Sequence, residues 1–197
     1  GHLVTGDGDG LSIGGNHMLH LLRRNVNLTI LLFNNRIYGL TKGQYSPTSE
    51  LGKITKSTPA GSADRPVNPL AFALGCGGTF VARTVDRNIQ HMEEMLRRAA
   101  HHKGTGFLEI LQNCNVYNDL AWNVMYDKES KLRYELRLEH GKPLLFGPPD
   151  DRRAVIMQGV APTVVKARDV AESALWIHDE KNVNAAKLIA DLFAPDF

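Results

Sequence analysis

Residues 6–10 of this chain read Gly-Asp-Gly-Asp-Gly, and they come directly after a short apolar run at 3–5. The segment 12–24 then carries apolar residues at helical spacing, which predicts an amphipathic helix. An unbroken apolar run follows at 28–33, as expected for a parallel strand that is buried on both faces. The order strand, helix, strand predicts a βαβ unit with the glycine-rich stretch at the end of its first strand.

The end of the second predicted strand carries amide side chains, Asn34 and Asn35, and a turn that continues through Ile37. Neighbouring parallel strands end at the same edge of an open α/β sheet, where ligands bind, so Asp7 and Asn35 are expected to lie close together. Magnesium prefers hard oxygen ligands. Asp7, the Asn35 side-chain oxygen and the Ile37 carbonyl therefore predict a magnesium site, and the glycines let a diphosphate approach the backbone.

Two other phosphate or metal motifs fit this sequence less well. A calcium-binding EF-hand loop needs a glutamate at its twelfth position, and counting from Asp7 that position is Met18. A P-loop needs Gly-Lys-Ser or Gly-Lys-Thr, which does not follow here. A bare Gly-Asp-Gly is an ordinary turn, so it is the strand context and the second motif that favour the diphosphate site.

The pattern of alternating helices and strands continues downstream. It predicts a helix at 68–74, a strand at 79–85, a helix at 88–102 and a strand at 106–111. The fold class expected is α/β, doubly wound, with a mostly parallel sheet and helices on both faces. The polar region at 37–65 is too long for a simple connection and is expected to be functional.

The pattern changes after about residue 125. We expect a hairpin, two short strands and a closing helix, at 136–146, 153–157, 163–167 and 183–193. We therefore divide the chain into an α/β domain at 1–130 and a C-terminal extension at 131–197 that packs on the core or on a partner subunit.

Composition excludes several classes of protein. The 197 residues are 43% hydrophobic, which suffices for a core, and the formal charge of +2 with scattered basic residues does not indicate nucleic-acid binding. No apolar run approaches the ~20 residues of a membrane-spanning helix, so we expect no membrane partner. Two cysteines do not indicate a secreted disulfide framework, which favours the cytoplasm.

The stretches at 5–17 and 32–48 are more specific than the tripeptide alone. Together they resemble the β subunit of 2-oxoacid:ferredoxin oxidoreductases, above all the enzymes for 2-oxoglutarate. The resemblance covers most of the chain and is densest from 3 to about 125. It implies a thiamine diphosphate-binding fold, with thiamine diphosphate and Mg²⁺ bound by the domain at 1–130.

The resemblance also implies roles for single residues. The magnesium ligands would be Asp7, Asn35 and the Ile37 carbonyl, and the complete set of cofactor contacts would be Gly6, Asp7, Gly8, Asp9, Asn35, Ile37, Gly39 and Leu40. Cys114 matches a cysteine that ligates a [4Fe-4S] cluster in the family, whereas Cys76 is expected to pack in the core. No catalytic residue is assigned in this chain, because the carboxylate that activates the aminopyrimidine ring comes from the partner subunit.

The implied reaction is oxidative decarboxylation of a 2-oxoacid, with 2-oxoglutarate giving succinyl-CoA. Electrons would pass through the [4Fe-4S] cluster to ferredoxin, and the partners would be an α subunit, ferredoxin, the 2-oxoacid and coenzyme A. Arg36 and Lys42 flank the metal-binding turn and are candidates to bind the distal carboxylate of the substrate. Pyruvate is the alternative substrate.

The cysteine content departs from the family pattern. The other three cluster cysteines of the family lie upstream of the diphosphate motif, and only Cys76 and Cys114 are present here. We therefore expect an N-terminally truncated fragment that is inactive by itself. Two rival functions are a non-oxidative thiamine diphosphate-dependent decarboxylase or synthase, and a structural or electron-transfer subunit without cofactor; Asp7 and Asn35 argue against the latter.

Overall fold

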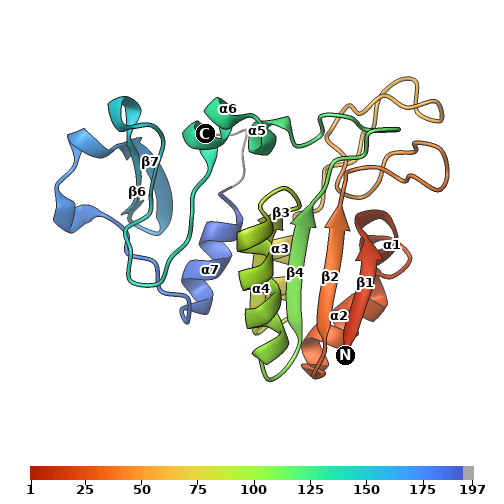
Figure 1. Ribbon diagram of the computed structural model, residues 1–197, viewed down its shortest axis with the longest axis horizontal. Coiled ribbons are helices and arrows are strands. Elements are labelled where there is room, and N and C mark those ends of the chain that lie inside the picture. Colours follow the sequence, from red (N-terminus) through yellow and green to blue (C-terminus); the bar gives the residue numbers. More distant parts are fainter. Residues whose placement is uncertain (193–197) are drawn as a thin grey trace. The chain divides into compact units, whose positions relative to one another are not determined.

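The computed structural model describes residues 1–192 (Figure 1). The chain forms two compact units, Gly1–Trp122 and Asn123–Phe197. The functional assignment of a cofactor domain and an extension stays a prediction.

The first unit contains a four-stranded sheet in the order β1-β2-β4-β3, in which every neighbouring pair is parallel (Figure 1). Its strands are β1 (His2–Gly6), β2 (Thr29–Asn34), β3 (Phe80–Val85) and β4 (Gly106–Leu111). Its helices are α1 (Asp7–Leu11), α2 (Gly15–Arg24), α3 (Pro69–Gly75) and α4 (Ile89–His101). The predicted α/β class and parallel sheet are confirmed.

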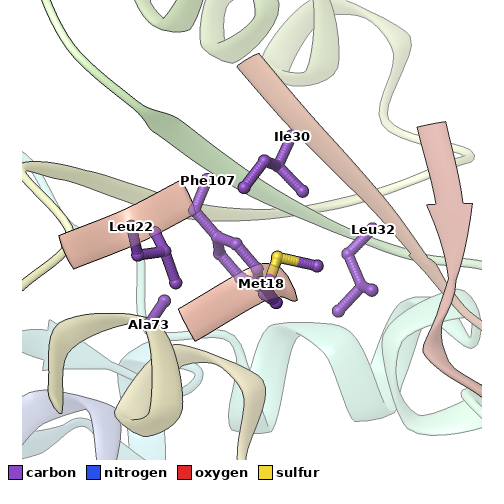
Figure 2. Close-up of a cluster of buried hydrophobic side chains, with 6 residues drawn as sticks. All are labelled: Met18, Leu22, Ile30, Leu32, Ala73 and Phe107. Atoms are coloured by element: carbon purple, nitrogen blue, oxygen red, sulfur yellow. The ribbon is translucent and has the colours of Figure 1, made fainter. Parts of the chain in front are cut away.

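Helices cover both faces of this sheet. Figure 2 shows the core on one face, where α2 and α3 pack against β2 and β4 through Met18, Leu22, Ile30, Leu32, Ala73 and Phe107. On the other face Met95 of α4 packs against Leu108 and Ile110 of β4. Because successive strand side chains point to opposite faces, both faces of the inner strands must be apolar. This explains the unbroken apolar run of β2 and confirms the doubly wound arrangement.

Local capping fixes where two of the helices begin. The Asn68 side chain accepts hydrogen bonds from the backbone N–H groups of Leu70 and Ala71, and Pro69 occupies the first turn of α3, a position where its missing N–H costs nothing. The Asn88 side chain caps α4 in the same way. Asparagine is among the preferred residues at this position because its oxygen satisfies an otherwise orphaned N–H.

The first helical segment differs from the prediction. Instead of one helix at 12–24, α1 comprises most of the glycine-rich stretch and α2 starts again at Gly15. Gly14 lies at the break, where an added Cβ would come 2.6 Å from the carbonyl oxygen of Asp9. Only glycine permits so close an approach, which is why the chain can turn between the two helices.

The segment between β2 and α3 has no regular helix or strand among the described residues, as predicted for 37–65. It is nevertheless anchored. Isolated bridges join Tyr38 to Gln44 and Thr55 to Thr58, and a short stretch at 46–49 is largely buried. We call the whole segment from 37 to 67 the β2–α3 loop.

The second unit has a three-stranded antiparallel sheet in the order β5-β6-β7. Its elements are α5 (Asn123–Tyr126), α6 (Lys128–Tyr134), β5 (Leu145–Phe146), β6 (Arg153–Gln158), β7 (Ala161–Lys166), α7 (Val183–Ala190) and the 3₁₀ turns Pro149–Asp151, Ala167–Asp169 and Glu172–Ala174. Leu144, Phe146 and Val155 form its buried core. The two predicted strands at 153–157 and 163–167 are confirmed as β6 and β7.

The hairpin predicted at 136–146 is wrong. Residues 136–142 form no strand, and Pro143 forms its bridge with Ile177 while β5 pairs with β6. Residues distant in the sequence thus pair with this segment, in place of the local hairpin that the turn at Gly141 indicated.

The predicted closing helix is confirmed as far as Ala190, and Phe193 lies outside the described residues. None of the helices within 1–192 is both long and apolar enough to cross a membrane.

Candidate active site

The carboxylate of Asp7 lies at the carboxyl edge of the sheet, at the junction of β1 and α1, and is only 1% exposed. Its Oδ1 atom accepts a hydrogen bond of 3.2 Å from the backbone N–H of Asn35. Asn35 directly follows β2, which pairs in parallel with β1. The structure therefore brings together the two residues that the sequence singled out, for the reason expected from parallel strands.

Hydrogen bonds from side chains hold the turn after β2, mainly through the carbonyl oxygens of its first two residues, Asn35 and Arg36. The Asn35 side-chain oxygen accepts from the Ile37 N–H at 3.3 Å. The Asn118 amide donates to the carbonyl oxygens of Asn35 and Arg36, and the Ser49 hydroxyl also donates to the Arg36 oxygen at 2.6 Å. These bonds hold Asn35 and Ile37 in one rigid turn beside Asp7. Residues 35–37 contain two of the predicted magnesium ligands, and we call them the metal loop for that prediction.

A second hydrogen-bond donor reaches Asp7 from the β2–α3 loop. The Thr48 hydroxyl lies 2.7 Å from Asp7 Oδ2 and 2.9 Å from Asn34 Oδ1. Sequence analysis missed Thr48, because no spacing rule connects a loop hydroxyl to a carboxylate on a distant strand. The burial of polar residues at 46–49 becomes visible only in the structure.

Behind the site lies a buried ion pair that sequence analysis also missed. Glu109 of β4 is fully buried; its Oε2 accepts from Arg83 Nε at 2.6 Å, and its Oε1 accepts from Asn34 Nδ2 at 2.7 Å. A charge inside a sheet requires such partners. The available signal was a glutamate within the otherwise apolar run at 106–111.

Burial raises the pKa of Asp7, and hydrogen bonds from Ser46, Thr48 and Asn35 oppose that shift only in part. A cation bound against the carboxylate stabilises the charged form, which burial disfavours. Carboxylate, amide and carbonyl oxygens are the donors that Mg²⁺ prefers. The residues present therefore suit a magnesium ion better than they suit a softer metal.

The other predicted diphosphate contacts lie on β1, on α1 and on the β2–α3 loop. Tyr38 closes over Gly8: its hydroxyl donates to the Gly8 oxygen at 2.9 Å, and an added Cβ on Gly8 would come 2.3 Å from the tyrosine ring. Gly6 ends β1, and the remaining predicted contacts are Asp9, which is exposed on α1, and Gly39 and Leu40 on the β2–α3 loop. Leu40 is 98% exposed.

The two cations proposed for substrate binding are placed differently. The Arg36 guanidinium lies 3.8 Å from the centre of the Trp122 ring, and burial lowers its pKa. Trp122 in turn donates from Nε1 to the Asn34 carbonyl at 2.8 Å. Lys42 is exposed on the β2–α3 loop. Arg36 is thus held at the metal loop, whereas Lys42 is not fixed by such a contact.

The two cysteines also occupy different surroundings. Cys114 is half-buried, and its carbonyl oxygen accepts from the N–H of Asn118 at 3.0 Å, the residue that holds the metal loop. Cys76 is the C-cap residue of α3 and packs against the core cluster that contains Met18 and Phe107, and burial raises its pKa. No group of three or more His, Cys, Asp or Glu residues within 1–192 could hold a metal ion.

Comparison with known families places this geometry in context. Residues 2–110 match the family described as thiamine pyrophosphate enzyme, C-terminal TPP binding domain. The chain belongs to this family of thiamine pyrophosphate enzymes. The matched range contains β1, the metal loop and β4 up to Ile110, so the paired strand ends that carry Asp7 and Asn35 lie within it.

Two relatives of the chain carry more specific names. The chain is 52% identical to the 2-oxoglutarate oxidoreductase subunit KorB of Mycobacterium tuberculosis over 90% of its own length and 47% of that protein. It is 46% identical to the 2-oxoacid:ferredoxin oxidoreductase subunit beta of Saccharolobus solfataricus over 62% of this chain and 40% of the relative. These names confirm the resemblance drawn from the sequence.

A solved structure agrees with these relatives. The 2-oxoglutarate:ferredoxin oxidoreductase from Magnetococcus marinus, with 2-oxoglutarate, coenzyme A and succinyl-CoA bound, is 39% identical, with a TM-score of 0.62. The match covers 71% of this chain and 47% of that one. The chain thus spans about half the length, or less, of the relatives it matches here.

Proposed function

We propose that this chain is part of the β subunit of a 2-oxoacid:ferredoxin oxidoreductase that acts on 2-oxoglutarate. The observation that carries the proposal is the buried carboxylate of Asp7, set against the metal loop at the shared edge of β1 and β2, in a chain of the thiamine pyrophosphate enzyme family. The names of similar proteins and of the similar structure support the choice of reaction and of substrate.

In this proposal the chain anchors the diphosphate end of the cofactor. Asp7, the Asn35 side chain and the Ile37 carbonyl hold Mg²⁺, and the nearby backbone contacts the diphosphate at Gly6, Gly8, Asp9, Gly39 and Leu40. Bound thiamine diphosphate supplies the electron sink for loss of carbon dioxide from a 2-oxoacid. The chain itself positions the diphosphate and holds the Mg²⁺ that neutralises its charge.

Arg36 is the better candidate to bind the distal carboxylate of 2-oxoglutarate. A guanidinium can bind a carboxylate through two parallel hydrogen bonds, and stacking on Trp122 holds this one beside the metal loop. Lys42 stays a second candidate. If Arg36 has this role, Arg36→Gln raises KM for 2-oxoglutarate about tenfold or more while changing KM for pyruvate little, since pyruvate lacks the second carboxylate.

The electron path requires groups beyond this sequence. A [4Fe-4S] cluster normally needs four thiolates, and the chain has two cysteines, of which Cys114 lies next to the metal loop through Asn118. We propose that Cys114 is one ligand and that other polypeptide supplies the rest. An α subunit, ferredoxin and coenzyme A complete the assembly, which we place in the cytoplasm.

The experiment that tests the proposal measures thiamine diphosphate binding to the complete enzyme with and without Mg²⁺. Asp7→Ala should abolish the magnesium-dependent part of the affinity. Asp169→Ala, which removes an exposed carboxylate on the second unit, is the matched control and should bind normally. Unchanged magnesium-dependent affinity in Asp7→Ala would show that the assignment is wrong.

Turnover measurements then distinguish the proposed oxidative decarboxylation from a non-oxidative reaction. With coenzyme A and oxidised ferredoxin present, we expect 2-oxoglutarate to reduce ferredoxin faster than pyruvate does. Decarboxylation that proceeds without reducing ferredoxin would instead identify a non-oxidative decarboxylase or synthase.

A further inference from the structure

Three polar residues of the β2–α3 loop are as deeply buried as the core. Ser46, Thr48 and Ser49 are 2%, 3% and 1% exposed. Loops normally lie on the surface, and a polar group buried without a hydrogen bond is costly. Here the Ser46 N–H donates to the Ser49 hydroxyl, which donates to the Arg36 carbonyl. The Thr48 hydroxyl contacts the side chains of both Asp7, which follows β1, and Asn34, which ends β2.

The orientation of Asn34 determines what surrounds the Thr48 hydroxyl. The amide Nδ2 of Asn34 donates to the carboxylate of Glu109, and an ionised carboxylate can only accept. The oxygen of the Asn34 amide must therefore be the atom that faces Thr48, at 2.9 Å. Both Asn34 Oδ1 and Asp7 Oδ2 are then acceptors, and they compete for one hydroxyl hydrogen.

The shorter of the two contacts goes to Asp7, at 2.7 Å against 2.9 Å. A hydrogen bond to a charged acceptor is also the stronger kind. The Asn35 N–H donates to Oδ1 and the Thr48 hydroxyl to Oδ2, so each oxygen of the Asp7 carboxylate has at least one donor, and Ser46 contributes a further hydrogen bond. Donors on both oxygens fix the plane of the carboxylate.

We propose that Thr48 is a positioning residue that holds the Asp7 carboxylate in the orientation needed to bind Mg²⁺. This inference rests on the proposed function, in which Asp7 is a magnesium ligand. Thr48 acts through Asp7 and does not itself contact the metal. Partners that orient a metal ligand typically contribute about 10- to 100-fold to metal affinity, so the effect is large enough to measure directly.

The competing explanation is that Thr48 only fastens the β2–α3 loop to the sheet. Thr48→Val and Thr48→Ser separate the two roles. Valine keeps the branched shape and removes the hydroxyl, whereas serine keeps the hydroxyl and removes a methyl group. Thr58→Val makes the same substitution elsewhere on the same loop, where Thr58 is joined to Thr55 through backbone hydrogen bonds, and serves as the control.

The test titrates Mg²⁺ into the complete, metal-free enzyme at saturating thiamine diphosphate, by calorimetry. We expect about tenfold or greater weakening in Thr48→Val, and affinities within about threefold of the parent in Thr48→Ser and Thr58→Val. Mn²⁺ bound in place of Mg²⁺ should show an altered electron paramagnetic resonance spectrum in Thr48→Val only. Thr48→Ala replaces the valine variant if valine prevents folding.

Different outcomes overturn different statements. If Thr48→Val binds Mg²⁺ like the parent while Asp7→Ala does not, the role of Thr48 is wrong and the proposed function stands. Equal weakening in Thr48→Val and Thr48→Ser also overturns it, because the hydroxyl is then not the group that matters. If Asp7→Ala itself binds Mg²⁺ normally, the proposed function fails and the inference fails with it.

Discussion

The side chains around Asp7 form one continuous set of hydrogen bonds. Arg83 donates to Glu109, which accepts from Asn34, and Thr48 bridges Asn34 and Asp7. The two buried acids thus have different hydrogen-bond donors: Glu109 accepts from a guanidinium, whereas Asp7 accepts from the neutral groups of Asn35, Thr48 and Ser46. At the scale of single residues, this difference predicts opposite consequences for removing the two charges.

Removing the charge of Asp7 should stabilise the folded chain when no metal is bound. Burial raises the folded pKa of Asp7, so its contribution to stability is complete below the unfolded value of about 3.9 and is lost as pH rises through the folded value. As pH rises above about 4, the free energy of unfolding of Asp7→Asn should therefore increase relative to the parent. Urea unfolding in a chelator measures this, and a difference that does not vary with pH would contradict it.

Removing the charge of Glu109 should destabilise the fold. Glu109→Gln weakens the charged hydrogen bond from Arg83 and leaves an amide beside Asn34, which we expect to cost about 1–3 kcal/mol in urea unfolding. Glu93→Gln is the matched control: Glu93 pairs with Arg97 on the exposed face of α4, and its loss should stay within about 0.5 kcal/mol. Equal effects of the two changes would show that burial of the pair does not matter.

At the scale of elements, the site depends on how α1 and the β2–α3 loop meet. The Tyr38 ring lies so close to Gly8 that an added Cβ would come 2.3 Å from it, and the tyrosine hydroxyl binds the Gly8 oxygen. Glycine is therefore required at position 8 by the packing of the tyrosine, independently of any phosphate. A substitution at this position should show a cost in stability before any cofactor is added.

We expect Gly8→Ala to lower the free energy of unfolding of the cofactor-free chain by about 1–3 kcal/mol, since the Tyr38 ring must shift. Gly15→Ala is the matched control, because an added Cβ at Gly15 meets nothing within 4 Å and alanine favours a helix. Tyr38→Ala should reduce the additional cost of Gly8→Ala. Additive effects of the two substitutions, measured in a double-mutant cycle, would exclude the proposed steric cause.

The turn that carries Cys114 and the metal loop are joined by one residue. Asn118 donates from its backbone to Cys114 and from its side chain to Asn35 and Arg36, and it accepts from Lys53 Nζ at 2.6 Å. The residue proposed to bind the cluster and the loop proposed to bind the metal therefore lie on one hydrogen-bonded framework.

At the scale of the whole molecule, the two cysteines should have separate roles. In the complete enzyme, Cys114→Ser should lower the iron content and block reduction of ferredoxin while magnesium-dependent binding of thiamine diphosphate is kept. Cys76→Ser should leave the iron unchanged, because Cys76 packs against the core on α3. Iron analysis of both variants tests this, and a loss of iron with Cys76→Ser alone would show that the cysteines were assigned the wrong way round.

The isolated 197-residue chain should not be self-sufficient. It holds two cysteines, fewer than the four thiolates that a [4Fe-4S] cluster normally needs. In the proposed enzyme a partner subunit supplies the aminopyrimidine side of the site. We expect weak thiamine diphosphate binding, no cluster, and no ferredoxin reduction with 2-oxoglutarate and coenzyme A. Robust turnover by the purified chain alone would contradict this.

Local patterns were enough to predict the parallel sheet and the meeting of Asp7 with Asn35. Each follows from short-range information: an apolar run long enough for a buried strand, a helical period, and the rule that parallel strands end at one edge. The hairpin at 136–146 was predicted from the same kind of local signal and was wrong, because Pro143 and β5 find their partners at Ile177 and β6.

The sequence by itself determined the fold class, the family and the two strand ends that carry the candidate site. Only the tertiary structure decided how the carboxylate is held: by Thr48 from a loop without regular structure, and by Asn34, whose orientation depends on Glu109. The physical reason is that periodicity and spacing record which face of an element is buried. Hydrogen bonds between residues far apart in the chain leave no such period, so they appear only once the chain has folded.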